Sequence, residues 1–427
     1  MEESGHAATT REKTEKTKER KIGIRNISFS LILKKYWTAI AVIIIVFLGF
    51  YVRVDGYSLP YLRNIDSYAF YRQINDIVKN GVFSLHDDLI LAPDGLDRQL
   101  DIFPYQYLGA YSYMFIRIFI PGLELWRYLI YFPALLAALL AIPMYFIGKT
   151  LYDKKAGVLA AFFIVLDISI MSRSLGGDPD TDAITILMAL LSMAIFLKTY
   201  KYLNEKKKLD KKGLIYTVLT GVTLGIFSHT WVGYWYVVWL ITGLILLKFI
   251  TDSAILKSIK TAWHTIKHVF YSYLLIMAIL ILLFIIPFYG ISSVISIFSG
   301  PIEFQSIKTE EGREFPNVYV SVAEMQESGG IKDIIERTSA IGGIAILLSP
   351  FFLMIYAILY LVYSFYKTHK HIDTVILLLI WFIGPLSATI IAVRFSILFA
   401  APMAIGSSIL LSKILRMITG EDKKIED

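Results

Sequence analysis

The sequence predicts an all-α membrane protein that crosses the bilayer many times, and two observations support this class. The chain of 427 residues is 56% hydrophobic and 18% charged, with a mean hydropathy of +0.60, whereas a typical soluble domain is about 25% charged. Its apolar residues also form unbroken runs of about 20, the length of a membrane-spanning helix, rather than amphipathic stripes. We therefore expect a polytopic bundle of about 10–12 spans.

The first 36 residues form a basic tail that contains nine Lys and Arg residues. Such an arm is typically solvated and disordered, and its position before the first apolar run indicates the cytoplasmic side. No small-residue cleavage site follows that run, so we expect a retained anchor. The net charge of +7 is placed in this tail and in inner loops, which argues against nucleic-acid binding. With no cysteine, disulfides and thiolate chemistry are excluded.

The long apolar runs define the expected spans in order. They cover about 37–54, 123–148, 155–172, 183–201, 213–229, 232–250, 268–288, 341–366, 373–392 and 396–415. The short aromatic segment 105–120 ends at Pro-Gly and is expected to lie at the membrane interface. Counting from a cytoplasmic N-terminus, the inner loops and a tail at 416–427 are Lys-rich, as the positive-inside rule requires. This predicts a multi-pass protein of the cell (plasma) membrane.

Two outer segments, about 55–122 and 290–340, exceed the length of ordinary connections and are functional candidates. Both are acidic: the first contains eight Asp, and 291–340 contains eight Asp and Glu against four Lys and Arg. Counting 105–120 as a span would exchange the sides of the later loops and invert this charge sorting. The sorting therefore supports a cytoplasmic N-terminus.

Three carboxylates, Asp178, Asp180 and Asp182, lie together in "GGDPDTD" between two expected spans, on the predicted outer face. Helix capping would explain any one of them, but not three within five residues. A D-x-D pair on a short turn brings two hard oxygen ligands within reach of one Mg²⁺ or Mn²⁺. Arg173, seven residues before Asp180, could neutralise a carboxylate or hold an anionic group.

Three further candidates lie in the other outer segments. Asp66 in "RNIDSYAFYRQ" is placed to cap an amphipathic helix. Glu324 in "NVYVSVAEMQESGG" follows a β-leaning stretch, where a solvated loop residue is the simpler interpretation. Arg394 in "AVRFSILFAAP" lies at the outer end of a late span, where snorkelling to the interface is the alternative.

In this order, "IDSYAFYR", "SRSLGGDPDTD", "SVAE" and "VRFSILFAAP" resemble the catalytic subunit of oligosaccharyltransferase. The similarity is closest to the single-subunit archaeal and bacterial forms of this GT-C-type family, and extends from about residue 35 to 415. It implies a GT-C-type transmembrane bundle over 37–415 with two large outer loops. It also implies transfer of a preassembled glycan from a lipid (poly)phosphate carrier to the Asn amide of an N-x-S/T acceptor on the outer face.

By this resemblance, Asp66, Asp180 and Glu324 would ligate one Mn²⁺ or Mg²⁺, and Asp182 would lie close to the ion. Asp66 and Glu324 would also accept hydrogen bonds from the acceptor amide, whose nitrogen is a poor nucleophile until it is twisted. A dication and nearby arginines would stabilise the charge that develops on the departing phosphate.

The remaining implied residues act on the two substrates. Arg394 and Arg173 would bind the lipid phosphate. Ser321 and Val322 belong to the S-V-x-E block that lies against the acceptor, and Arg337 would contact the peptide or order its loop. The expected partners are thus a lipid-linked oligosaccharide, an acceptor polypeptide and membrane lipids, with no nucleic acid.

The sequence departs from the family in one respect. Family members continue into a large outer domain with a W-W-D-Y-G block that recognises the acceptor hydroxyl, and this block does not occur here. A natural short form, a truncated gene product and a second chain that supplies the module all remain open. The alternatives are a GT-C transferase that uses a lipid-phosphate sugar, or a silent or partner-dependent short paralogue. A transporter fits less well, because these charges lie at helix ends.

Overall fold

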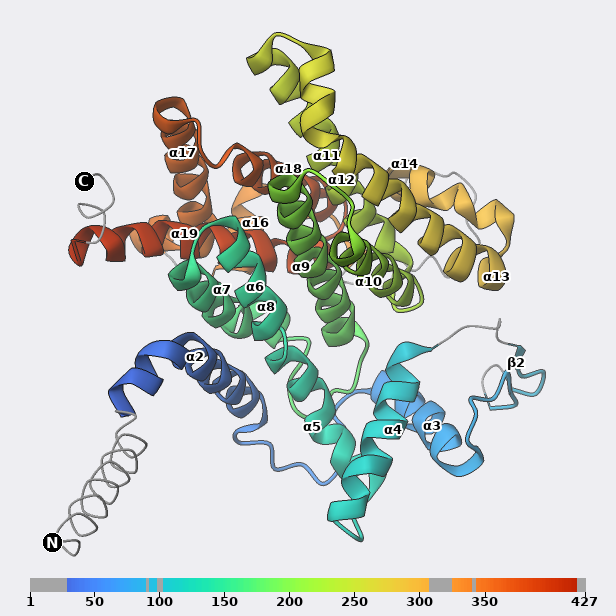
Figure 1. Cartoon of the computed structure of the whole chain (residues 1–427). Helices are drawn as coiled ribbons and strands as arrows, with labels where there is room; N and C mark the ends of the chain where they lie inside the picture. Colours follow the sequence, from blue (N-terminus) through green and yellow to red (C-terminus); the bar gives the residue numbers. More distant parts are fainter. Residues whose placement is uncertain (1–28, 90–91, 98–102, 307–324, 340–342, 421–427) are drawn as a thin grey trace, which may run out of the picture.

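The computed structural model describes residues 29–89, 92–97, 103–306, 325–339 and 343–420. It is built almost entirely of helices, as expected, and Figure 1 shows them gathered into one elongated bundle. Eight helical segments of the described chain are long and apolar enough to cross a membrane, which defines a multi-pass membrane protein. They are Lys35–Val54, Leu125–Leu151, Asp182–Lys206, Val232–Leu256, Ile259–Tyr289, Pro350–Thr368, Ile372–Ile391 and Val393–Ile418.

The elements of the N-terminal half follow one another with short connections. They are α2 (Phe29–Val54), α3 (Ile65–Asn80), β1 (His86–Asp87), β2 (Leu96–Asp97), α4 (Pro104–Phe119), α5 (Leu125–Ala138), α6 (Ala141–Leu151), α7 (Lys154–Leu166), α8 (Ile168–Met171), α9 (Asp182–Lys206) and α10 (Lys211–Ser228). The strands β1 and β2 form a minimal antiparallel hairpin.

The C-terminal half contains several short 3₁₀ and π segments, labelled η, between its longer helices. Its elements are η1 (Val232–Tyr234), α11 (Trp235–Leu256), α12 (Ile259–Ile279), η2 (Leu280–Ile285), α13 (Ile286–Tyr289), η3 (Ile291–Val294), α14 (Ser296–Ser306), α16 (Ile331–Thr338), η5 (Gly343–Leu348), α17 (Pro350–Thr368), α18 (Ile372–Ile391), η6 (Val393–Phe399) and α19 (Ala400–Ile418).

Two expected spans are helical but do not meet the length and hydropathy of a span. The run expected over 155–172 breaks at Asp167, because its carboxylate accepts the N–H groups of Ser169 and Ile170 and starts α8 as a new turn. The other is α10, which has only 18 residues and begins with two lysines. Both α7 and α10 nevertheless pack inside the bundle, α7 against α6 and α19, and α10 against α9 and α12.

One other expected span begins later than predicted. The span expected from 341 starts at Pro350, because a proline without an N–H favours the first turn of a helix and a 3₁₀ segment precedes it. The span expected over 396–415 lies within the candidate span Val393–Ile418, which begins with η6, so Arg394 lies in a 3₁₀ turn before α19 starts at Ala400.

The segment expected as the first outer loop, about 55–122, folds onto one end of the bundle in its described part. Its helices α3 and α4 pack against each other and against α5, and Figure 1 shows this group with the β-hairpin beside it. The segment expected at the membrane interface is α4, a helix of 16 residues that is not among the candidate spans. Its position at an interface remains a prediction.

Candidate active site

A cavity of about 670 Å³ lies where α3, the α8–α9 connection and η6 meet. Its wall is mostly polar and contains four carboxylates and two arginines. The lining residues are Asn64, Asp66, Ala69, Phe70, Gln73, Ser172, Arg173, Asp178, Asp180, Asp182 and Arg394. Residues far apart in the sequence therefore form one charged site.

Arg53, near the end of α2, fixes the α8–α9 connection in place. The side chain of Arg53 is only 2% exposed and donates to Ser174 Oγ at 2.9 Å and to the Val165 carbonyl at 2.7 Å. The Arg53 carbonyl accepts the N–H of Gly176 at 2.8 Å. A buried guanidinium with several acceptors holds its neighbours in one geometry, so the acidic connection is positioned by residues outside the cavity.

Two glycines allow the connection to approach its neighbours closely. A Cβ on Gly176 would lie 3.1 Å from the Arg53 carbonyl oxygen, and one on Gly177 would overlap the Tyr57 hydroxyl. Gly177 also has a φ of +81°, the left-handed region that other residues rarely adopt. Its N–H donates to the Ile130 carbonyl at 2.9 Å. The "GG" before the aspartates is therefore a structural requirement of this turn.

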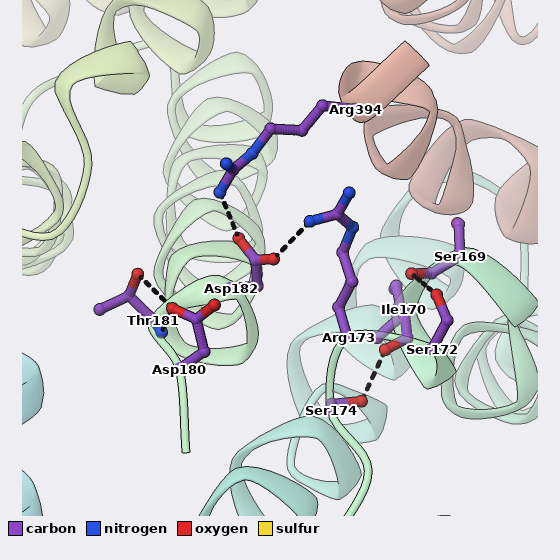
Figure 2. A network of polar contacts seen from close by, with 9 residues as sticks. All are labelled: Ser169, Ile170, Ser172, Arg173, Ser174, Asp180, Thr181, Asp182 and Arg394. Carbon is purple, nitrogen blue, oxygen red and sulfur yellow. Dashed lines mark hydrogen bonds and ion pairs between the residues drawn. The ribbon is translucent and has the colours of Figure 1, made fainter. Parts of the chain in front are cut away.

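Asp182, the first residue of α9, is the point where the two arginines converge, as Figure 2 shows. Arg173 Nη1 donates to Asp182 Oδ2 at 3.0 Å, and Arg394 Nη2 donates to Oδ1 at 3.4 Å. Asp182 is 17% exposed, against 24% for Arg173 and 40% for Arg394. One carboxylate thus holds together guanidinium groups from the α8–α9 connection and from η6.

Asp180 and Asp178 carry negative charge that this pairing does not neutralise. Burial, followed by the nearby charge of Asp182, raises the pKa of Asp180 above its usual value. Burial likewise raises the pKa of Asp178, against the opposing effect of a hydrogen bond from Ser67 Oγ at 3.2 Å. Asp180 Oδ1 accepts the N–H of Thr181 at 2.5 Å. The site is thus one in which a further positive charge would be favourable.

Asp66 reaches the same cavity from the first turn of α3. The helix expected around Tyr68, Tyr71 and Ile74 is confirmed, but its N-cap is Asn64 rather than Asp66, and Asn64 makes no side-chain capping bond. Asp66 is exposed and makes no hydrogen bond to the described residues that would occupy its carboxylate. Helix capping therefore does not account for Asp66.

The structure brings together five of the candidate residues predicted from sequence. Asp66, Arg173, Asp180, Asp182 and Arg394 all line the one cavity. In the part of the chain that the structure describes, no three His, Asp or Glu side chains form a group that could hold a metal ion.

The remaining candidates lie elsewhere. Glu324, Ser321 and Val322 fall outside the described residues. Arg337 lies on α16, where its Nε donates to Asp333 Oδ1 at 2.8 Å, and does not line the cavity.

Several lining residues were not predicted. Asn64 and Gln73 carry no motif of their own, although Asn64 directly precedes "IDSYAF" and Gln73 follows it on the same helix. Asp178 was noticed as a third carboxylate but was not assigned to the site. Its proximity in sequence to Asp180 was the available signal.

The fold and the cavity define a class: a polytopic, almost entirely helical membrane protein with an acidic, arginine-bordered site at one end of its bundle. The sequence model described as "Oligosaccharyl transferase STT3, N-terminal" matches residues 33–421. The chain belongs to this family.

Relatives are consistent with this assignment. The dolichyl-phosphooligosaccharide-protein glycotransferase of Methanococcus voltae is 25% identical over 409 residues, which is 87% of this chain and 44% of the relative. The protein of the same name from Methanocaldococcus jannaschii is 23% identical, with 85% and 47% covered. This chain therefore spans about half the length of the curated relatives it matches.

Solved structures share the fold. Archaeal oligosaccharyltransferase AglB from Archaeoglobus fulgidus, in complex with an inhibitory peptide and a dolichol-phosphate, aligns with a TM-score of 0.64 at 20% identity, covering 92% of this chain and 52% of that one. The oligosaccharyltransferase of the same organism in complex with Zn and sulfate aligns with a TM-score of 0.58 at 21% identity, covering 88% and 49%.

Proposed function

We propose that this protein transfers a preassembled glycan from a lipid (poly)phosphate carrier to the side-chain amide of Asn in an N-x-S/T acceptor. The observation that carries the proposal is the cavity in which Asp66 and Asp180 face a pair of arginines held by Asp182. Carboxylates suit an amide N–H and a dication, whereas guanidinium groups suit a phosphate. The names of the relatives support the same reaction.

A divalent cation, Mn²⁺ or Mg²⁺, fits the carboxylates of this cavity. Asp66 and Asp180 both line it, and the raised pKa of Asp180 reflects negative charge that a cation would offset. We propose these two residues and Glu324 as its ligands. When bound, the cation would supply positive charge next to the carrier phosphate. The Archaeoglobus fulgidus oligosaccharyltransferase, which has been solved in complex with Zn and sulfate, is consistent with this proposal.

In the proposed reaction, the Asn nitrogen attacks the anomeric carbon of the glycan. The new C–N bond forms as the bond between that carbon and the carrier phosphate oxygen breaks, and the phosphate leaves with the electron pair. One amide proton must be removed, and we assign its acceptance to the carboxylates of Asp66 and Glu324. These oxygens also hold the amide N–H groups, which turns the nitrogen lone pair out of conjugation and makes it available.

Arg394 and Arg173 are proposed to bind the leaving phosphate. Because Asp182 already orients both guanidinium groups, they would meet the developing charge without further ordering. Arg394 is the more exposed of the two, and Figure 2 shows the two arginines reaching different oxygens of the Asp182 carboxylate. We therefore propose Arg394 as the first contact for an entering carrier.

The segment around 291–340 is proposed to hold the acceptor. The described chain resumes at Met325, and the Gln326 carbonyl accepts the N–H of Val393 at 2.9 Å, directly beside Arg394. This contact supports placing the S-V-x-E block, with Ser321 and Val322, near the cavity. Arg337, already held by Asp333 on α16, is a weaker candidate for contacting the peptide.

We further propose that the site faces the outside of the plasma membrane and that the N-terminus is cytoplasmic. The Lys-rich loops on one side and the acidic loops on the other support this orientation. We also propose a second chain as a partner that supplies the W-W-D-Y-G block, which does not occur in this sequence.

The decisive test is transfer in vitro with purified full-length protein, Mn²⁺, a lipid-linked glycan and a fluorescent N-x-T peptide. Asp66→Ala and Glu324→Ala should abolish product without disturbing membrane insertion. The matched control is Asp76→Ala on the same helix, which does not line the cavity and should keep transfer intact. Unchanged transfer by Asp66→Ala would refute the site.

A second set of transfer reactions also contains candidate partner chains. Product from this chain alone would show that no outer domain is needed for the chemistry. Metal and lipid binding without product, in every arm, would favour a silent relative that keeps the fold.

A further inference from the structure

Tyr105, which no motif singles out, is buried directly behind the acidic wall of the cavity. It is the second residue of α4 and only 1% exposed. Its ring is wedged between Phe70 and Phe132, each with a ring centroid 5.3 Å away. Phe70 itself lines the cavity. The tyrosine is therefore held rigidly one layer behind the site.

The hydroxyl of Tyr105 has no hydrogen-bond partner among the residues that the structure describes. A buried hydroxyl without an acceptor is destabilising, so such a group calls for a functional explanation. The negatively charged groups that act on this hydroxyl indicate which residue could accept its hydrogen bond. Burial raises the pKa of Tyr105 well above its usual value, and the carboxylates of Asp180 and then Asp178 raise it further. Both carboxylates are thus close to the phenol.

Asp180 has a carboxylate oxygen that lacks a hydrogen-bond donor among the described residues. Its Oδ1 accepts hydrogen bonds from Thr181, whereas Oδ2 accepts none from the described chain. A hydrogen bond donated to a carboxylate stabilises the ionised form. A hydrogen bond between the two groups would therefore satisfy donor and acceptor together.

We propose that Tyr105 is a positioning residue that, when a divalent cation is bound, donates a hydrogen bond from Oη to Oδ2 of Asp180 and so orients this carboxylate toward the cation. The inference rests on the proposed function, because it assigns Asp180 to the cation. A residue of this kind hydrogen-bonds to the side chain that ligates the metal, fixes the rotamer of that side chain and keeps it ionised. Tyr105 itself touches neither substrate.

The test compares the wild type with Tyr105→Phe and Tyr113→Phe in the same detergent. Tyr113 is a matched control because it lies on the same helix, is 4% exposed, and donates to the Leu123 carbonyl at 2.8 Å. Two quantities are measured: the melting temperature with a chelator, and the Mn²⁺ affinity from the paramagnetic resonance of free Mn²⁺.

We expect Tyr105→Phe to melt at the same or a higher temperature than the wild type, because it removes an unsatisfied buried hydroxyl. Its Mn²⁺ affinity should fall about 10-fold, as for other residues that support a metal ligand. Tyr113→Phe should do the opposite, melting lower with unchanged Mn²⁺ affinity. A merely structural role for Tyr105 would give both variants the behaviour of Tyr113→Phe.

The possible failures are distinguishable. If the wild type binds Mn²⁺ and Tyr105→Phe binds it equally well, this inference alone is wrong. If Tyr105→Phe melts as low as Tyr113→Phe, its hydroxyl is satisfied in the fold and the inference is again overturned. A wild type that binds no Mn²⁺ removes the cation proposal and this inference with it. A wild type that binds Mn²⁺ but transfers no glycan removes the transferase proposal and leaves the role of Tyr105 standing.

Discussion

Asp182 decides the geometry of the site at the level of single residues. It accepts hydrogen bonds from Arg173 and Arg394 with different carboxylate oxygens, so neither arginine can be repositioned without affecting the other. Its own charge in turn raises the pKa of Asp180. One side chain therefore couples the region proposed for the phosphate to the region proposed for the cation.

Asp182→Asn should keep the shape of this residue but weaken its hold on both guanidinium groups. We expect glycan transfer to fall about 100-fold, the scale of loss that follows a misplaced catalytic group. The control is Glu124→Gln, which breaks the exposed pair with Arg127 outside the cavity and should change transfer little. Equal rates for the two variants would contradict the role of Asp182.

The pH dependence of stability should identify Asp180. Its pKa is raised in the folded protein, so the protonated form contributes stability that is present below the usual value of 3.8 and is lost as the pH rises through the folded pKa. Asp180→Asn removes the charge. In chelator it should therefore melt higher than the wild type at about pH 7, and this gain should shrink toward about pH 4.

Asp210 is the control, because its pKa is shifted in the opposite direction to that of Asp180. Hydrogen bonds from the Gly213 N–H and then from the Tyr202 hydroxyl lower the pKa of Asp210, so its stabilising effect is lost as the pH falls through the folded pKa. Asp210→Asn should melt lower than the wild type at neutral pH. A lower melting temperature for Asp180→Asn as well would show that its charge is compensated in the fold.

At the level of elements, the α8–α9 connection is the part that the fold controls most tightly. Arg53 fixes it from α2, and Gly177 brings it against Tyr57 and Ile130. The connection then delivers the aspartates to the cavity at the start of α9. Its backbone geometry is therefore part of the site.

Gly177→Ala should destabilise the protein through both strain and steric overlap. The left-handed backbone costs a residue with a Cβ about 1–2 kcal/mol, and the new methyl group would overlap the Tyr57 hydroxyl. Gly122→Ala separates the two effects, because Gly122 has a φ of +88° with nothing within 4 Å of the added Cβ. Thermal unfolding should show a clearly larger loss for Gly177→Ala. Similar losses of stability in the two variants would mean that the Tyr57 side chain moves aside at little energetic cost.

At the level of the whole molecule, the side of the membrane on which each loop lies can be tested cleanly, because the chain has no cysteine. Single cysteines would be introduced at Asn80, the last residue of α3, and at Lys208, before α10, both exposed positions. A membrane-impermeant maleimide added to intact cells should label Asn80→Cys and spare Lys208→Cys until the cells are lysed. The reverse pattern would invert the proposed orientation.

Much of the architecture was predictable because hydropathy is a local property of each run. The helices around Asp66 and after Asp182 were expected and are present. Two expected spans have different boundaries because of local features that hydropathy does not measure. The Asp167 carboxylate starts α8 and so interrupts one expected span, and Pro350 marks a later start for α17. The candidate residues Glu324, Ser321 and Val322 remain predictions, because they lie outside the described residues.

The sequence by itself determined the class of protein, its helical runs and the motifs that carry carboxylates and arginines, since these depend on residue type and spacing along the chain. Only the tertiary structure decided that Arg394 meets Asp182 across 212 residues, and that Asp178 lines the same cavity. Such contacts depend on distances between packed helices. Burial then sets the electrostatics, because a charge removed from water interacts more strongly with its neighbours.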